Sequence, residues 1–275
     1  ATGITLAGTG KKGTTITLKL NNKIANQEGY VITVKPRAIV IEGKTPQGVF
    51  YGVQTLRKSL PVEQTATVNL PVGKVADYPR FGYRGAMLDC ARHYFSVPFV
   101  KEYIDVLALH NINTFHWHLT EDQGWRVEIK RYPKLSEIGS KRAQTVMGNN
   151  TELYDGVPYG GYYTQDEMRD IVKYAAERYI TIIPEIDMPG HMLGALAAYP
   201  EYGCTGGPYK VAERWGVFDD ILCAGNPKTY EFVNNILDEL LDIFPSKYIH
   251  LGGDEAPRTR WKACPRCQAE IKRLN

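Results

Sequence analysis

From residue 83 onward the chain alternates short apolar runs with segments of helical spacing, and this alternation limits its fold more than any other feature. A capping box at Thr164–Glu167 and an Asn226-Pro227 pair predict the starts of two of the intervening helices. A long loop is predicted between the second strand and Tyr163. Alternating strands and helices imply a parallel sheet with right-handed crossovers. The predicted strands are residues 83–88, 112–117, 180–186 and 248–251, the last of them buried.

Residues 1 to about 78 follow a different pattern and predict a small α+β domain, a sheet covered by one helix. Runs at 14–20, 30–34 and 38–42 are rich in β-branched residues and are predicted strands. A helix is predicted from Thr45-Pro46, where apolar residues recur at helical spacing. The segment 77–80 is the predicted boundary, which leaves residues 79–275 as a second domain.

The second domain has too few strands for a complete barrel. A (β/α)8 barrel, the TIM barrel, needs eight strands and about 250 residues, whereas four strands are predicted here. Four parallel strands alone would expose both edges of the sheet. The predicted fold class is therefore α/β: about the first four βα units of a TIM barrel, preceded by the small α+β domain.

Composition excludes several classes of function. The chain is 43% hydrophobic and 23% charged, as an ordinary globular protein is, and its net charge of +3 is too small to indicate a nucleic-acid partner. No apolar run approaches the roughly 20 residues of a membrane-spanning helix. The chain starts at Ala1; removal of a leader or a cloning boundary would give the same start.

Five cysteines give a weak signal. Cys264 and Cys267 have the spacing of half a zinc site, but no second pair of cysteines or histidines follows them. Because a closed zinc site takes four ligands, we expect no metal, and interpret the pair as a local disulfide or two free thiols.

Polar side chains gather at the carboxyl end of every predicted strand. In a parallel α/β sheet this is the edge where ligands bind. Strand ends also border solvent, and a histidine pair such as His116 and His118 is more commonly structural than metal-binding. Buried carboxylates need partners, however, so the convergence favours a site. The residues are Asp89, Arg92, His93, His116, His118, Glu121, Asp122, Glu185, Asp187, His191, His250, Asp254 and Glu255.

Asp254 and Glu255 are the most informative of these residues. Side chains alternate along a strand, so two adjacent carboxylates face one site only where the backbone turns. Gly252 and Gly253, directly before them, allow another group to lie close to the backbone. Two neighbouring carboxylates disfavour each other's ionisation.

Four motifs in order closely resemble family-twenty β-N-acetylhexosaminidases, and the resemblance extends over almost the whole chain. It implies a glycosidase that removes terminal β-linked N-acetylglucosamine or N-acetylgalactosamine with retention, the substrate's own acetamido group assisting. The motifs are Arg84-Gly85-x-x-Leu88-Asp89-x-x-Arg92-His93, His116-Trp117-His118-Leu119-Thr120-Glu121-Asp122-Gln123-Gly124-Trp125-Arg126, Glu185-Ile186-Asp187-Met188-Pro189-Gly190-His191 and His250-Leu251-Gly252-Gly253-Asp254-Glu255.

By this resemblance Glu255 is the general acid and base, and Asp254 holds the acetamido group. Arg84 would bind the sugar's O3 and O4 hydroxyls, and Asp187 would also contact the substrate. Supporting residues would be His191, Glu121 and His250; many relatives have aspartate at the position of Glu121. The resemblance implies no metal and no organic cofactor.

The implied partners are glycans or glycoconjugates that contain N-acetylhexosamine, and the implied location is periplasmic or extracellular. The family's aromatic acetamido pocket comes from later strands, so a C-terminal half or a second chain is expected. Two alternatives are an inactive fragment and a non-catalytic sugar-binding derivative of the fold. A chitinase-type barrel is disfavoured because its D-x-x-D-x-D-x-E motif is absent.

Overall fold

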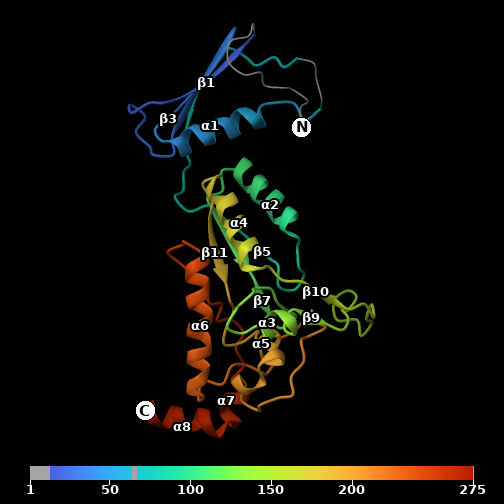
Figure 1. Cartoon of the computed structure of the whole chain (residues 1–275). Helices are drawn as coiled ribbons and strands as arrows, with labels where there is room; N and C mark the ends of the chain where they lie inside the picture. The colour runs from blue at the N-terminus through green and yellow to red at the C-terminus, as the bar shows by residue number, and fades with distance from the viewer. Residues whose placement is uncertain (1–12, 64–66, 275) are drawn as a thin grey trace. The chain divides into compact units, whose positions relative to one another are not determined.

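The computed structural model describes residues 13–63 and 67–274, and the chain divides into two compact units. Unit 1 comprises residues 1–85, 103–113 and 177–180. Unit 2 comprises residues 86–102, 114–176 and 181–275. Figure 1 shows the strands and helices of both.

Unit 1 contains a four-stranded sheet in the order β1-β3-β2-β4. β1 pairs with β3 in parallel, whereas β2 pairs antiparallel with both β3 and β4. Three strands and the helix agree with the sequence prediction; β4, a short strand with every residue exposed, was not predicted. The elements are β1 (Thr15–Leu20), β2 (Tyr30–Lys35), β3 (Ala38–Gly43), α1 (Pro46–Lys58) and β4 (Gly73–Asp77).

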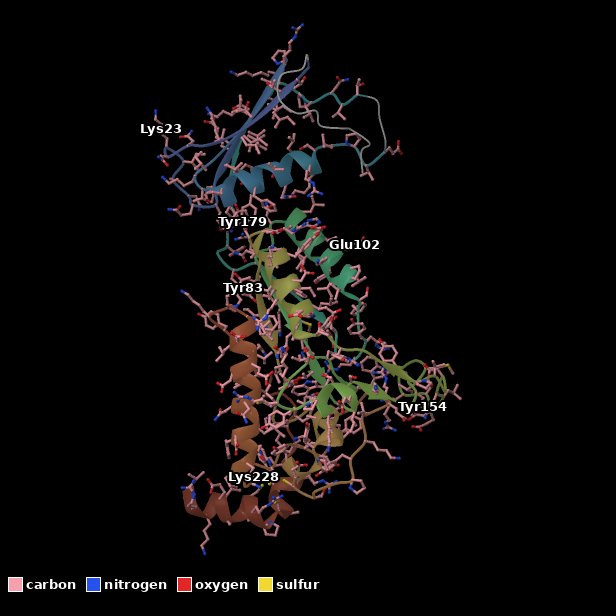
Figure 2. All side chains as sticks on the ribbon, in the orientation of Figure 1. Lys23, Tyr83, Glu102, Tyr154, Tyr179 and Lys228 are labelled. Atoms are coloured by element: carbon pink, nitrogen blue, oxygen red, sulfur yellow. The ribbon has the colours of Figure 1, made fainter. Side chains whose placement is uncertain are left out.

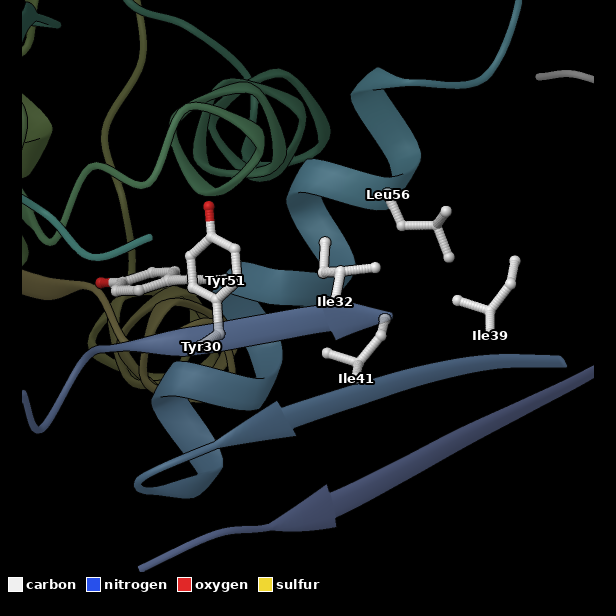
Figure 3. Close-up of a cluster of buried hydrophobic side chains, with 6 residues drawn as sticks. All are labelled: Tyr30, Ile32, Ile39, Ile41, Tyr51 and Leu56. Atoms are coloured by element: carbon white, nitrogen blue, oxygen red, sulfur yellow. The ribbon is translucent and has the colours of Figure 1, made fainter. Parts of the chain in front are cut away.

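The core of unit 1 lies between the sheet and α1, as Figure 3 shows. Alternate residues of β2 and β3 face the helix, following the two-residue period of a strand. Thr45 caps α1: its hydroxyl accepts a hydrogen bond from the Gly48 amide at 3.2 Å. The buried cluster consists of Tyr30, Ile32, Ile39, Ile41, Tyr51 and Leu56.

Unit 2 is built on a parallel sheet in the order β11-β6-β5, which matches three of the four predicted barrel strands. Helix α4 begins with the predicted capping box, in which Thr164 and Glu167 bond each other's backbone amides. Asn226 caps α6 through its side-chain oxygen. Two elements are divided between the units, β5 (Gly85–Asp89) and α2 (Val97–Leu109), since Gly85 and residues 103–109 belong to unit 1. The other elements are β6 (Thr114–His118), α4 (Gln165–Ala176), β11 (Thr181–Glu185), α5 (Leu193–Ala198), the 3-10 helix η1 (Pro200–Tyr202), α6 (Pro227–Ile243), α7 (Thr259–Ala263) and α8 (Pro265–Leu274).

The predicted fourth strand is only partly formed. His250 makes a parallel bridge to Glu185, and the Ile186 amide donates to the His250 carbonyl at 3.1 Å. The prediction of burial was wrong, because Tyr248 is 70% exposed and Leu251 is 43% exposed. Within the described residues, this segment pairs with β11 on one side and with no strand on the other. An apolar run is buried only if a neighbour covers it.

The segment from Leu119 to Tyr163, predicted as one long loop, has its own structure. Two short antiparallel pairs and a one-turn helix form within it. The fully buried Arg126 guanidinium holds it together by donating to the carbonyls of Ala91, Ser140 and Gly161. The elements are β7 (Thr120–Glu121), β8 (Gly124–Trp125), α3 (Lys134–Glu137), β9 (Lys141–Arg142) and β10 (Tyr159–Gly160).

The architecture is α/β, and the strands of the described residues form no closed barrel. None of the helices in residues 13–63 and 67–274 combines the length and apolarity that crossing a bilayer requires.

Replacing Asn226 tests the cap of α6. Asn226→Ala removes the acceptor of the Lys228 amide and is expected to lower the free energy of unfolding by about 1 kcal/mol. Asn226→Ser is the control, since serine caps about as well, and both variants lose the bond from Asn226 to the Glu201 carbonyl. Urea denaturation of the three proteins measures the difference. Equal stability of the alanine and serine variants would contradict the capping role.

Candidate active site

The polar residues predicted to converge do so within unit 2. Strands β5, β6 and β11 are parallel and end at Asp89, His118 and Glu185. Their carboxyl ends therefore meet at one edge of the sheet. The loops that follow these strands add the remaining side chains.

Glu185 is the centre of the histidine contacts. Its Oε2 accepts from His116 Nε2 at 2.5 Å and from His118 Nδ1 at 2.6 Å, and its Oε1 lies 2.9 Å from His250 Nδ1. Burial alone would raise the pKa of this carboxyl, but hydrogen bonds from His116 and His118 hold it well below its usual range. Glu185 is thus an anion that ties three strand ends together.

His118 also contacts a second buried carboxylate, that of Glu121. Its Nε2 lies 3.3 Å from Glu121 Oε1, which also contacts Arg92 Nη2 at 2.6 Å. Arg92 Nη1 contacts Asp89 at 2.8 Å. Burial would lower the pKa of His118, but hydrogen bonds with Glu121 and Glu185 raise it to about 9. Burial would raise the pKa of Glu121, but hydrogen bonds from His118 and His191 and the charge of Arg92 lower it to about 2.

His191 connects the buried carboxylates to the exposed pair. Its Nδ1 lies 3.0 Å from Glu121 Oε2 and 3.1 Å from Asp122 Oδ2. Its Nε2 points the other way, 3.4 Å from Glu255 Oε2 and 3.8 Å from Asp254 Oδ2. Hydrogen bonds with Asp122 and Glu121 raise the pKa of His191 to about 11. An imidazolium therefore faces the two predicted catalytic carboxylates.

Asp187 supports the turn that carries these carboxylates. It is 1% exposed, and its Oδ1 accepts from the Gly253 amide at 3.0 Å. Gly252 has a φ of 63°, and a Cβ there would lie 1.8 Å from Asp187 Oδ1, so only glycine fits. Burial, with the charge of Asp254, raises the pKa of Asp187 to about 7.

The expected backbone turn is present at Asp254 and Glu255. Gly253 and Glu255 have φ angles of 95° and 46°, so regular strand geometry ends at this point. The side chains of Asp254 and Glu255 are 63% and 58% exposed. A buried, charged support thus ends in two accessible carboxylates.

Arg84 belongs to unit 1. Its guanidinium donates to both Glu28 oxygens, to the Tyr51 hydroxyl at 2.8 Å, and to the Asn111 and Phe81 carbonyls. These acceptors use all five N–H groups. The contact between Arg84 and a sugar stays a prediction, and it would require Arg84 to give up one of these partners.

Sequence reasoning placed Arg92 and Asp122 at the strand ends without giving them roles. The structure connects Arg92 to Glu121, and Asp122 to both His191 and the Leu193 amide. The sequence signal for both residues was their position shortly after the first and second predicted strands. A hollow of about 580 Å³ is lined by His93, Val146, Gly148, Asn149 and Trp215.

Three groups in this network have the spacing of metal ligands. His191 takes part in two of them, with its Nδ1 3.0 Å from Glu121 Oε2 and its Nε2 3.8 Å from Asp254 Oδ2. In the third group, the Glu185 carboxylate already binds His116 and His250 directly.

The chain matches two family models in succession. Residues 81–275 match the catalytic domain of glycosyl hydrolase family 20, and residues 1–78 match domain 2 of the same family. The β-hexosaminidase of Porphyromonas gingivalis is 48% identical over 252 residues, which is 90% of this chain and 31% of that protein.

Solved structures agree with these matches. A crystal structure of a β-N-acetylhexosaminidase is 35% identical with a TM-score of 0.85, covering 96% of this chain and 56% of that one. An exo-β-N-acetylglucosaminidase from Vibrio harveyi, in complex with N-acetylglucosamine, is 38% identical with a TM-score of 0.78, covering 94% of this chain and 41% of that one. The chain thus spans between about a third and just over half of these relatives.

The raised pKa of His118 predicts how stability depends on pH. The folded chain keeps a proton that the unfolded chain releases above about pH 6.5. The stability from this histidine is fully present below pH 6.5 and is lost as the pH rises through about 9. Urea denaturation across this range should show falling stability, with a shallower fall in His118→Gln.

His110→Gln, at the end of α2, is the matched control and should keep the wild-type slope. Some slope remains in His118→Gln, since the pKa of His191 is raised as well. If that variant does not fold, NMR titration of the wild-type imidazole gives the answer directly. A His118 midpoint near 6.5 would contradict the predicted ion pairs.

Proposed function

Because the chain belongs to glycosyl hydrolase family 20, we propose that it carries the acid/base part of an exo-β-N-acetylhexosaminidase. The proposed reaction removes terminal β-linked N-acetylglucosamine or N-acetylgalactosamine with retention. The observation that supports it best is His191 Nε2 facing Asp254 and Glu255 from a buried, charged support.

In the first proposed step the acetamido oxygen of the substrate attacks the anomeric carbon. The bond from that carbon to the leaving oxygen breaks, and Glu255 gives its proton to the leaving oxygen. The sugar is left as an oxazolinium-like intermediate. Asp254 would accept a hydrogen bond from the acetamido N–H and stabilise the positive charge that develops on this group.

In the second step water attacks the anomeric carbon and opens the oxazolinium ring. Glu255, now a carboxylate, takes a proton from this water and is restored to its acid form. Each of the two displacements inverts the anomeric carbon. The released sugar therefore keeps the β configuration of the substrate. No protein nucleophile is needed, in agreement with the substrate-assisted scheme.

The buried residues would orient the reacting pair. His191, held by Glu121 and Asp122, limits where the Glu255 carboxylate lies. Asp187 would fix the Gly252-Gly253 turn and approach the substrate beside Asp254. His250, joined to Glu185, would support the base of this turn.

Arg92 is a better candidate than Arg84 for binding the sugar's hydroxyls. Arg92 lies beside Asp89 and Glu121 at the strand ends, with its side chain 25% exposed. A planar guanidinium suits two neighbouring hydroxyls because it donates two parallel hydrogen bonds. All the donors of Arg84, in contrast, have partners in unit 1.

We propose that residues 1–78 form the small domain and residues 79–275 about the first four βα units of a TIM barrel. The remaining strands, and an acetamido pocket, would come from further residues of a longer protein or from a second chain. The ranges of the two family models support the division, and the partial coverage of the relatives supports the remaining strands. A periplasmic or extracellular location also remains a proposal.

Glu255→Gln tests the acid/base role. Loss of the transferable proton should lower kcat for an aryl β-N-acetylglucosaminide by about 10²- to 10⁴-fold. Binding of N-acetylglucosamine, measured by calorimetry, should remain. The assay uses the 275-residue chain first, and a longer protein containing it if the folded chain alone shows no turnover.

Glu270→Gln is the matched control, since Glu270 pairs with Arg273 on α8. Unchanged activity in Glu255→Gln would rule out the proposed role. Sugar binding without turnover in the wild-type protein would favour the non-catalytic alternative.

Arg92→Lys and Arg84→Lys decide between the two arginines. Loss of a charged hydrogen bond of about 1.5–3 kcal/mol should lower kcat/KM by at least tenfold in Arg92→Lys. Arg84→Lys should lower the unfolding temperature and leave KM near the wild-type value, because its partners are Glu28 and Tyr51. The reverse result would support Arg84.

A further inference from the structure

Four of the five cysteines lie together in unit 2. Cys204 follows η1, Cys223 precedes α6, and Cys264 and Cys267 lie where α7 meets α8. Their four sulfur atoms all lie within 4.8 Å of one another. Three of the four residues are buried and Cys204 is partly buried. The fold thus gathers thiols from positions up to 63 residues apart.

Three of the six sulfur separations are close to those of a tetrahedral metal site. Cys204 and Cys267 are 3.8 Å apart, Cys223 and Cys264 3.8 Å, and Cys223 and Cys267 3.6 Å. Four thiolates at about 2.3 Å from a zinc ion lie about 3.8 Å from one another. Disulfide sulfurs are about 2.05 Å apart, and none of these cysteines is in a disulfide.

The backbone around the sulfurs provides a hydrogen bond of the kind that supports thiolate ligands. The Gly225 amide donates to Cys267 Sγ at 3.4 Å. Donors of this kind orient a ligand and stabilise its charge. Gly225 is required here, because a Cβ would lie 2.2 Å from the Arg266 carbonyl carbon.

The two C-terminal helices have almost no apolar core of their own. α7 buries none of its residues, and Cys267 is the one buried residue of α8. Cys204 and Trp261 are the partly buried residues that pack against the buried sulfurs. Figure 2 labels Lys228, at the start of α6, the helix that follows Cys223. Since such short helices need an added constraint to be stable, a bound ion would explain their docking.

We propose that Cys204, Cys223, Cys264 and Cys267 bind one zinc ion in a closed, tetrahedral structural site. Four sulfur ligands leave no open position for substrate or water, so the ion takes no part in the proposed hydrolysis. Hydrolysis and zinc binding are independent proposals, since neither needs the other to hold.

The site would also restrain the loop that carries the acidic pair. Helix α7 begins four residues after Glu255, and Cys264 lies at its end. On the other side of the cluster, the Leu222 amide donates to the Pro189 carbonyl at 2.9 Å, two residues before His191. The zinc ion would therefore anchor both segments that meet at His191 and Glu255.

We expected no metal because no second pair of cysteines or histidines follows Cys264 and Cys267 in the sequence. Cys204 and Cys223 come before that pair, separated from it by α6 and α7. The spacing of the first two cysteines is too wide for a familiar zinc motif. The fold was needed to show that they complete the set.

The test is the metal content of the full 275-residue chain, purified under reducing conditions from zinc-supplemented medium. Elemental analysis should find about one zinc per chain. Cys264→Ala and Cys267→Ala should each lose it, and a strong chelator should lower the unfolding temperature of the wild type. Cys90→Ala is the matched control, since Cys90 is buried against Trp117 and should leave the zinc content unchanged.

Three results would overturn the proposal: four reactive thiols with no metal, two disulfides with one remaining thiol, or one iron per chain in a coloured protein. If the alanine variants do not fold, Co²⁺ titration of the chelator-treated wild type replaces them. Thiolate-to-cobalt charge-transfer absorption that saturates at one ion, and is displaced by Zn²⁺, supports the site. Absence of that absorption contradicts it.

Discussion

The organisation of unit 2 depends on a buried series of alternating negative and positive side chains. It runs from Glu185 through His118 and Glu121 to His191, with successive contacts of 2.6, 3.3 and 3.0 Å. A single buried charge would be costly, and each group here has an opposite charge beside it. These contacts join β6, β11 and the loops beyond them into one support.

This support separates the residues that position from the residues that react. Glu121, Asp187 and His191 are almost fully buried, whereas Asp254 and Glu255 are accessible. Functional groups are held accurately when their neighbours cannot move. The turn at Gly252 connects the buried positioning residues to the two accessible carboxylates. Asp187 lies so close to this turn that no side chain fits at position 252.

Local signals in the sequence were reliable. The caps at Thr45, Thr164 and Asn226 start helices as predicted, because each depends on residues within one turn. Predictions that depended on distant neighbours were less successful. Tyr248 is exposed because no strand of the described residues covers it.

By itself, the sequence determined the order of strands and helices and the gathering of acids and histidines at one edge, since parallel strands share the direction of their carboxyl ends. Tertiary structure decided which residues become partners. Arg84 binds Glu28 and Tyr51, Arg92 binds Glu121, and four distant cysteines form one cluster. Periodicity and caps act over a few residues, whereas side-chain pairing depends on how segments far apart in the chain pack together.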